Sequence, residues 1–98
     1  MVSGDLAPVF EAAARGALGT GPLAQTDGPH VGVVLASGGY PGAYETGAPI
    51  DGLDTAAALD DVLIFHAGTA VRDGAIVTTG GRVLTVVGRG ADVRQAID

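Results

Sequence analysis

The sequence predicts an α+β fold in which a small antiparallel or mixed β-sheet is flanked by helices at both ends of the chain. Hydrophobic residues make up 47% of the 98 positions and the mean hydropathy is +0.39, which is typical of a chain that folds around a core. Apolar residues recur at helical spacing near both ends, and short β-branched runs bounded by glycine lie between them. A small single core with helices at its edges fits this pattern.

The first predicted element is an amphipathic helix over residues 3–17. Its apolar residues recur at intervals of three to four, namely Leu6, Val9, Phe10, Ala13 and Ala17. Ser3 or Asp5 can cap its beginning, and Gly16 and Gly19 end it. Residues 19–29 are rich in glycine and proline and predict a linker.

A strand is predicted over residues 30–37, where a nearly continuous β-branched run is typical of a strand covered on both faces. A long glycine-rich loop follows over residues 38–53. Residues 54–61 then contain one or two helical turns, capped by Asp54 or Thr55.

The second half of the chain contains four further extended runs. They are residues 62–66, 69–71, 75–78 and 82–88. The dipeptide Asp73-Gly74 is a strong hairpin signal, so the runs on either side of it are predicted to pair. Gly80-Gly81 makes the next turn.

A final helix begins near Asp92. Asp92 and Gln95 have the spacing of a capping box, in which the carboxylate accepts from the backbone three residues on and the glutamine reaches back. The apolar residues that follow at helical spacing are Val93, Ala96 and Ile97. So short a helix without a stop signal predicts that the chain ends inside an element, and both ends are interpreted as fragment boundaries.

The charge and composition exclude several classes of function. The net charge is −6, and the five arginines are scattered, which argues against nucleic-acid binding. There is no lysine for a Schiff base and no cysteine for a disulfide or a thiolate metal site. No run approaches the roughly 18 apolar residues of a membrane span, and no signal peptide is recognisable, so we expect a soluble, cytoplasmic protein.

The most suggestive local chemistry is the segment from Thr78 to Arg82. Consecutive backbone N–H groups in a glycine turn, beside a hydroxyl and a guanidinium, can hold a phosphate or a carboxylate. The alternative is a plain hairpin turn whose arginine pairs with one of the eleven carboxylates. The sequence leaves both open.

Other polar segments have simpler interpretations. His66 follows an apolar run and has no neighbouring nucleophile, so a hydrogen-bonded structural histidine is favoured. His30 and His66 could meet in space, but two ligands do not make a zinc site, and no metal is expected. Asp60 and Asp61 are expected to be a solvated surface pair.

The loop at residues 38–47 contains two tyrosines. We expect Tyr40 and Tyr44 to pack over the turn with their hydroxyls exposed, while Pro41 fixes its own φ.

Four motifs in order identify a family. They are Gly39-Tyr40-Pro41-Gly42-X-Tyr44-Glu45-X-Gly47, Ile50-X-Gly52-Leu53, Phe65-His66-Ala67-Gly68-Thr69, and Thr78-X-Gly80-Gly81-Arg82-Val83-Leu84-X-Val86. Together they resemble the carboxyl-terminal domain of glycinamide ribonucleotide synthetases, which are phosphoribosylamine–glycine ligases. The resemblance runs through residues 30–98.

The resemblance implies a domain plan and a chemistry. Residues 1–18 would be the terminal helix of a preceding ATP-grasp domain, 19–29 a linker, and 30–98 the carboxyl-terminal domain, of hybrid-motif type and truncated in its last helix. The whole enzyme would join glycine to phosphoribosylamine through a glycyl phosphate, using ATP and Mg or Mn in de novo purine synthesis. Its remaining domains would be partners of this segment.

The site residues follow from the same resemblance. No catalytic residue is expected here, and the residues expected nearest the substrates are His66, Ala67, Gly68, Thr69, Gly80, Gly81 and Arg82. Nothing in the chain resembles the family's ATP-binding strands, its metal-binding Glu/Asn pair or its phosphate-binding glycine loop. The isolated chain is therefore expected to bind neither ATP nor metal and to be inactive.

One departure from the family pattern is Thr79, which stands where the family usually has asparagine and removes an amide near the glycine turn. Two alternatives to a ligase segment stay open. One is a stand-alone, non-catalytic β module that docks on a partner protein. The other is a free-standing binder of small anions that uses the turn at Thr79 to Arg82.

Overall fold

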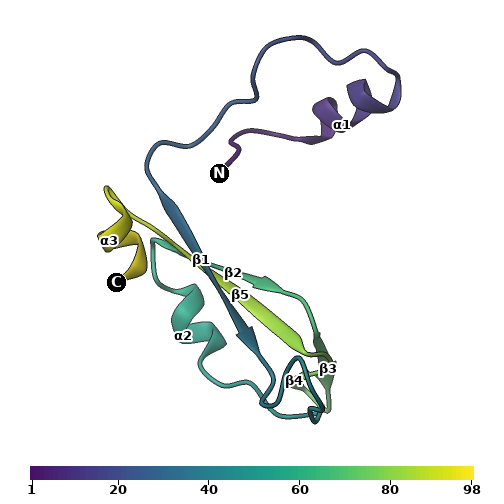
Figure 1. The fold of residues 1–98 in the computed structure, drawn as a ribbon, viewed down its shortest axis with the longest axis vertical. Coiled ribbons are helices and arrows are strands. Elements are labelled where there is room, and N and C mark those ends of the chain that lie inside the picture. Colours follow the sequence, from purple (N-terminus) through teal and green to yellow (C-terminus); the bar gives the residue numbers. More distant parts are fainter.

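The structure is a computed structural model that describes all of residues 1–98. Its elements follow in the order α1 (Ala7–Ala14), β1 (His30–Ala36), α2 (Leu53–Ala57), β2 (Val62–His66), β3 (Thr69–Arg72), β4 (Ala75–Thr78), β5 (Arg82–Arg89) and α3 (Val93–Ile97) (Figure 1). All strand pairs are antiparallel. The predicted α+β class is confirmed.

The main sheet has three strands in the order β1-β5-β2, so the last strand of the chain lies between the first two. Val86 of β5 pairs with Val33 on one side and with Ile64 on the other. Two of the few buried residues of the chain lie on β5, namely Val83 and Leu84, which are only 6% and 4% exposed. β5 therefore organises the fold.

Strands β3 and β4 form a separate hairpin, as the sequence predicted. Asp73 and Gly74 have φ of 53° and 78°, and two consecutive positive φ angles are what a two-residue hairpin turn of this hand requires. The loop before α2 runs along the free edge of β4, because the Ile50 N–H donates to the Ile76 carbonyl at 2.9 Å. The loop between β1 and α2 therefore connects the β3–β4 hairpin to the end of β1.

Helices α2 and α3 cover the same face of the three-stranded sheet (Figure 1). A Cβ on Gly88 would overlap the carbonyl of Ala96 in α3, which places α3 on the face that Gly88 shares with Val86. Leu53 and Ala57 of α2 line a cavity with the β2 residues of that same face. The helices thus form one layer on one side only.

The opposite face of the sheet carries no layer from this chain. A Cβ on Gly32 would lie 3.4 Å from Cγ2 of Thr85 and 3.6 Å from Cγ2 of Val87, which defines the residues that share this face. We call it the uncovered face, and its members are Gly32, Val34, Leu63, Phe65, Thr85 and Val87. Val34, Leu63 and Phe65 are 53%, 43% and 47% exposed.

The expectation that residues 30–37 are covered on both faces is therefore wrong. β1 is an edge strand, and the side chains from Gly32 to Ala36 are all exposed. Both faces of β1 are exposed, with Val33 and Leu35 of the helix side at 57% and 48% and Val34 of the opposite side at 53%, because the short helices α2 and α3 do not extend over this part of the edge strand.

Helix α1 is shorter than the predicted 3–17, because it begins at Ala7 with Pro8 in its first turn. Leu6 occupies the N-cap position, but Asp5 still accepts from the Ala7 N–H at 2.9 Å. Gly16, with φ of 67°, follows its end as predicted. None of the three helices has the length and apolar character needed to cross a membrane.

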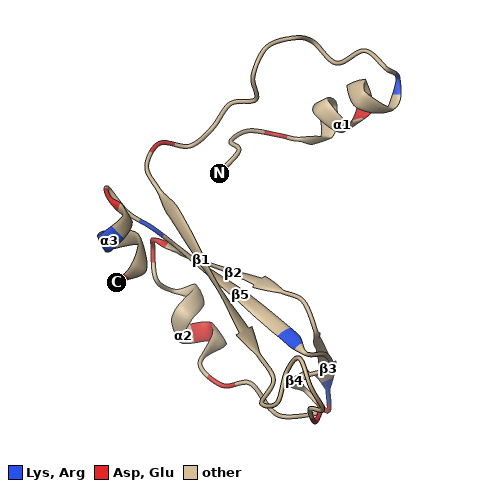
Figure 2. Cartoon of the chain, in the orientation of Figure 1, with Lys and Arg blue, Asp and Glu red and all other residues tan.

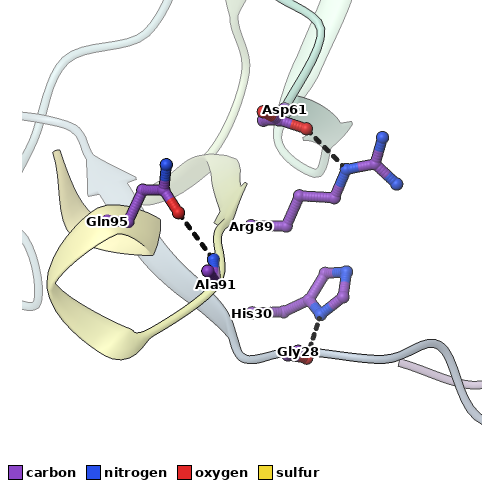
Figure 3. Close-up of polar contacts among 6 residues, drawn as sticks. All are labelled: Gly28, His30, Asp61, Arg89, Ala91 and Gln95. Atoms are coloured by element: carbon purple, nitrogen blue, oxygen red, sulfur yellow. Dashed lines mark hydrogen bonds and ion pairs between the residues drawn. The ribbon is translucent and has the colours of Figure 1, made fainter.

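Of the caps predicted for the other two helices, that of α2 is wrong and that of α3 is confirmed. Gly52, with φ of 82°, precedes α2, so neither Asp54 nor Thr55 caps it as expected. At α3, Asp92 Oδ1 accepts from the Gln95 N–H at 2.8 Å, which confirms that cap. The Gln95 side chain reaches back one residue further than expected and accepts from the Ala91 N–H at 2.7 Å (Figure 3).

The chain is less compact and exposes more surface than a typical globular domain of its size. Its radius of gyration is 17.1 Å, against about 13 Å for a compact domain of this length. Its accessible surface is 7115 Å², roughly 2,000 Å² more than a folded monomer of this mass exposes. Part of the excess is the arm that carries α1, which stands away from the sheet (Figure 1).

Candidate functional site

Four segments of the chain meet where β5 begins. They are the end of β1, the loop that carries Tyr40, the β2–β3 connection and the β4–β5 connection. They enclose an open cavity of about 610 Å³, lined by Val34, Tyr40, Ala67, Gly68, Gly81, Arg82, Leu84 and Thr85. Four of these eight residues belong to the predicted substrate-binding set.

Backbone hydrogen bonds hold the two predicted segments together. The N–H groups of Ala67 and Gly68 donate to the carbonyls of Val83 and Arg82, both at 2.9 Å. The Thr79 N–H donates to the Gly68 carbonyl at 2.8 Å. The β2–β3 connection is therefore fastened across the start of β5, which brings the two segments into one region.

Gly68 is required by this close approach. A Cβ there would lie 2.7 Å from the Arg82 carbonyl oxygen and 2.8 Å from Cα of Gly80. Both are backbone atoms that pairing holds in place, so a side chain at position 68 cannot be accommodated by rotating a neighbour. Position 68 therefore requires glycine, whereas a Cβ on Gly80 would come no closer than 3.4 Å to Cα of Gly68.

The turn at Gly80 and Gly81 carries unpaired donors. Neither N–H group donates to an acceptor anywhere in the chain. Gly81 is also a buried residue and lines the cavity. Backbone N–H groups that the fold leaves without an internal acceptor are satisfied from outside the chain, so this turn can receive an acceptor such as an anionic group.

Arg82 adds an unpaired positive charge beside those donors. The ion pairs in the structure are Arg15 with Glu11 and Arg89 with Asp61, and Arg82 has none. β4 and β5 also belong to different sheets, so the turn between them is no hairpin. The interpretation as a plain hairpin turn with a paired arginine is wrong on both counts.

His66 and Thr69 do not face this cavity. The Nδ1 atom of His66 lies 2.9 Å from the Thr69 hydroxyl, which ties the two ends of the β2–β3 connection together. His66 instead lines a smaller cavity of about 350 Å³ beside α2. The structural role considered for this histidine fits its geometry.

His30 lies at the other end of the sheet. It pairs with Arg89, whereas His66 pairs with Leu84, which puts the two histidines roughly 17 Å apart along β5. The suggestion that they could meet is wrong. His30 Nδ1 contacts the Gly28 carbonyl at 3.2 Å (Figure 3), and no group of three metal-ligating side chains occurs in the chain.

The adjacent acids Asp60 and Asp61 were expected to be a solvated surface pair, but Asp61 forms an ion pair. Asp61 is not merely solvated, because its Oδ1 accepts from Nε of Arg89 at 2.8 Å (Figure 3). Both side chains stay more than half exposed, so the pair contributes little to stability. The basic residues are few and spread over different elements, without a basic patch (Figure 2).

Residues outside the predicted set also build the cavity. Val34, Tyr40, Leu84 and Thr85 also line it. Tyr40 and Tyr44 do pack together, with ring centroids 6.2 Å apart and planes tilted by 57°. The Gly39-Tyr40-Pro41 motif was a signal for this loop, but nothing local to it indicated contact with Gly81.

Comparison with known proteins decides the family. The sequence profile described as "Phosphoribosylglycinamide synthetase, C domain" matches residues 30–98. The chain belongs to the phosphoribosylglycinamide synthetase family. The family resemblance of the four motifs is thereby confirmed.

Relatives with curated names agree with this assignment. Phosphoribosylamine–glycine ligase of Pseudomonas aeruginosa is 59% identical over 68 residues, which are 69% of this chain and 16% of that protein. The ligase of Agrobacterium fabrum is 45% identical over 92 residues, covering 94% of this chain and 21% of that protein. The synthetase C domain described here thus spans about a fifth of such relatives or less.

A solved structure shows the same fold. The crystal structure of phosphoribosylamine–glycine ligase from Thermotoga maritima superimposes with a TM-score of 0.69 at 40% identity. The match covers 88% of this chain and 20% of that one. The chain therefore has the fold of about a fifth of that ligase.

Proposed function

We propose that this chain forms one wall of the substrate site of a phosphoribosylamine–glycine ligase, which joins glycine to phosphoribosylamine with ATP. The family membership and the curated names of the relatives support the reaction. The unpaired N–H of the cavity-lining residue Gly81, beside the unpaired Arg82, supports the location, because such a pair of donors suits an anionic group of a substrate.

The predicted site residues take three different roles in this proposal. The N–H groups of Gly80 and Gly81 and the guanidinium of Arg82 bind the anion. Ala67 and Gly68 bring backbone close to it and leave room for it. His66 and Thr69 fix the β2–β3 connection through their mutual hydrogen bond rather than touching the substrate.

ATP and its metal ion belong to other domains in this scheme. No three metal-ligating side chains gather in the chain, and the cavity carries no carboxylate among its lining residues. Magnesium with a nucleotide needs carboxylates and a phosphate-binding loop, so these residues do not fit that role. The nucleotide would activate the glycine carboxylate elsewhere, while this wall holds and orients the substrate.

The division of labour gives a first prediction. A full-length ligase that contains this segment is expected to form glycinamide ribotide from glycine, phosphoribosylamine and ATP. The 98-residue chain is expected to show no ATP hydrolysis above a buffer blank, with or without the other substrates. Coupled ADP release measures both, and hydrolysis by the chain alone would contradict the proposal.

The uncovered face is where we place the remaining domains of the ligase. Its exposed side chains, with Phe65 at 47% and Val34 at 53%, form a contiguous apolar surface beside the cavity. Contiguous exposed apolar surface of this kind marks an interaction site. Domains packed there would also bring further substrate-binding groups to the open side of the cavity.

A second prediction concerns the chain without those domains. Its uncovered face is expected to drive self-association, so that sedimentation velocity shows dimers or larger species at micromolar to millimolar concentration. Phe65→Ser should shift the distribution toward monomer, whereas Val71→Ser should not, because Val71 is 75% exposed on the separate hairpin. A chain that stays monomeric at the highest attainable concentration would contradict this use of the face.

A further inference from the structure

We propose that Ser37 and Tyr40 are positioning residues that aim the N–H groups of the Gly80–Arg82 turn into the cavity. The inference rests on the proposed anion-binding role of that turn and deepens it. Neither residue belongs to the predicted substrate-binding set, and they lie about 40 positions from the turn in sequence. Only the fold brings them to it.

Ser37 holds two successive carbonyl groups of the turn. Its hydroxyl donates to the Gly80 carbonyl at 2.7 Å, and its backbone N–H donates to the Gly81 carbonyl at 2.7 Å. The side chain of Ser37 is part-buried, so water competes little for the first of these bonds. One residue thus anchors both peptide units of the turn from the same side.

Anchoring the carbonyls also aims the N–H groups. The Gly80 carbonyl and the Gly81 N–H belong to one planar trans peptide unit and point in opposite directions. Holding the carbonyl on Ser37 therefore directs the Gly81 N–H away from Ser37. The same reasoning applied to the Gly81 carbonyl directs the Arg82 N–H away from it.

Tyr40 closes the turn from a second direction. A Cβ on Gly81 would overlap Cδ2 of the Tyr40 ring, so the ring lies directly against Gly81 and buries it. The Tyr40 N–H donates to the Ser37 carbonyl at 3.0 Å, so the backbone of Tyr40 is held by the same residue that holds the turn. The ring also lines the cavity, next to Gly81 and Arg82.

This arrangement is more than a structural support for the turn. A turn built only for stability would also pair its donors, yet Ser37 satisfies the two carbonyls and leaves the N–H groups of Gly80 and Gly81 free. Fixed donors that lose no orientational freedom on binding hold an anion better than mobile ones.

The test is a titration of the ¹⁵N-labelled chain with inorganic phosphate, followed at the amide resonances of Gly80 and Gly81. The wild-type resonances should shift and saturate. Ser37→Ala and Tyr40→Leu should each weaken the affinity about 5- to 10-fold, the effect of losing one intramolecular hydrogen bond or one packed wall. Ser37→Thr and Tyr40→Phe keep the hydroxyl and the ring, and should restore it.

Tyr44→Leu is the matched control, because Tyr44 packs on Tyr40 but does not line the cavity. If the wild type binds phosphate at Gly81 and all variants bind equally well, the positioning role is overturned while the anion site stands. If the wild type shows no shift at Gly81 with phosphate or with glycine, the proposed function of the turn fails first.

A second measurement does not depend on any ligand. Gly81→Ala should destabilise the wild-type chain strongly, because its methyl group would overlap the ring, and much less in a Tyr40→Ala background. Chemical denaturation of the four proteins gives the coupling. Equal losses in both backgrounds would show that the ring does not hold the turn, and would overturn the inference even if a titration variant failed to fold.

Discussion

Replacing Arg82 with alanine in a full-length ligase that contains this segment is expected to lower kcat/KM about 10- to 100-fold. Arg82 has no carboxylate partner in the chain, so its guanidinium is free to bind an anionic substrate group. A charge-assisted hydrogen bond to such a group is worth about 1.5–3 kcal/mol, and each 1.4 kcal/mol is tenfold. Steady-state kinetics with phosphoribosylamine and glycine varied in turn measures the loss.

Two companion variants sharpen this test. Arg82→Lys should recover only part of the activity, because a lysine keeps the charge but not the planar fork of donors. Arg94→Ala removes a positive charge from α3, away from the cavity, and should leave kcat/KM unchanged. Equal losses for Arg82→Ala and Arg94→Ala would point to net charge rather than to a site.

Replacing Gly68 with alanine is expected to destabilise the chain by about 2–3 kcal/mol. The added Cβ would lie 2.7 Å from the Arg82 carbonyl oxygen and 2.9 Å from the Gly80 nitrogen. Relief requires the β2–β3 connection to move away from β5, which breaks its hydrogen bonds to Arg82 and Thr79. Urea denaturation followed by circular dichroism measures the change.

Gly38→Ala provides the matched control. Gly38 lies in the neighbouring loop, a Cβ there would meet nothing within 4 Å, and its φ is not in the left-handed region. It should therefore change the free energy of unfolding by less than about 0.5 kcal/mol. A Gly68→Ala chain as stable as this control would show that the two connections are not packed as the structure describes.

Short-range sequence patterns predicted much of the local structure of this protein. Asp73-Gly74 predicted the β3–β4 hairpin, because few other dipeptides accept two positive φ angles in succession. The spacing of Asp92 and Gln95 predicted the cap of α3, since that bond spans only three residues. The spelling and order of four motifs were enough to give the family.

The expectation for β1 failed because it depended on surroundings that local sequence does not encode. The apolar run of β1 predicted a strand covered on both faces, yet β1 is an exposed edge strand. The predicted substrate-binding set treated residues 66–69 as one group. The alternation of side chains along β2 instead sends His66 to the α2 side, while Ala67 and Gly68 line the cavity.

The amino-acid sequence alone determined the family, the α+β class and the hairpin. The tertiary structure decided what completes that site: Ser37 on the carbonyls of the turn, Tyr40 over Gly81, and Arg82 without a partner. The reason is physical. Turns and helix caps depend on hydrogen bonds between residues close in the chain. Ser37 and Tyr40 instead reach the glycine turn only because β1 pairs with β5, which lies about 50 residues later in the sequence.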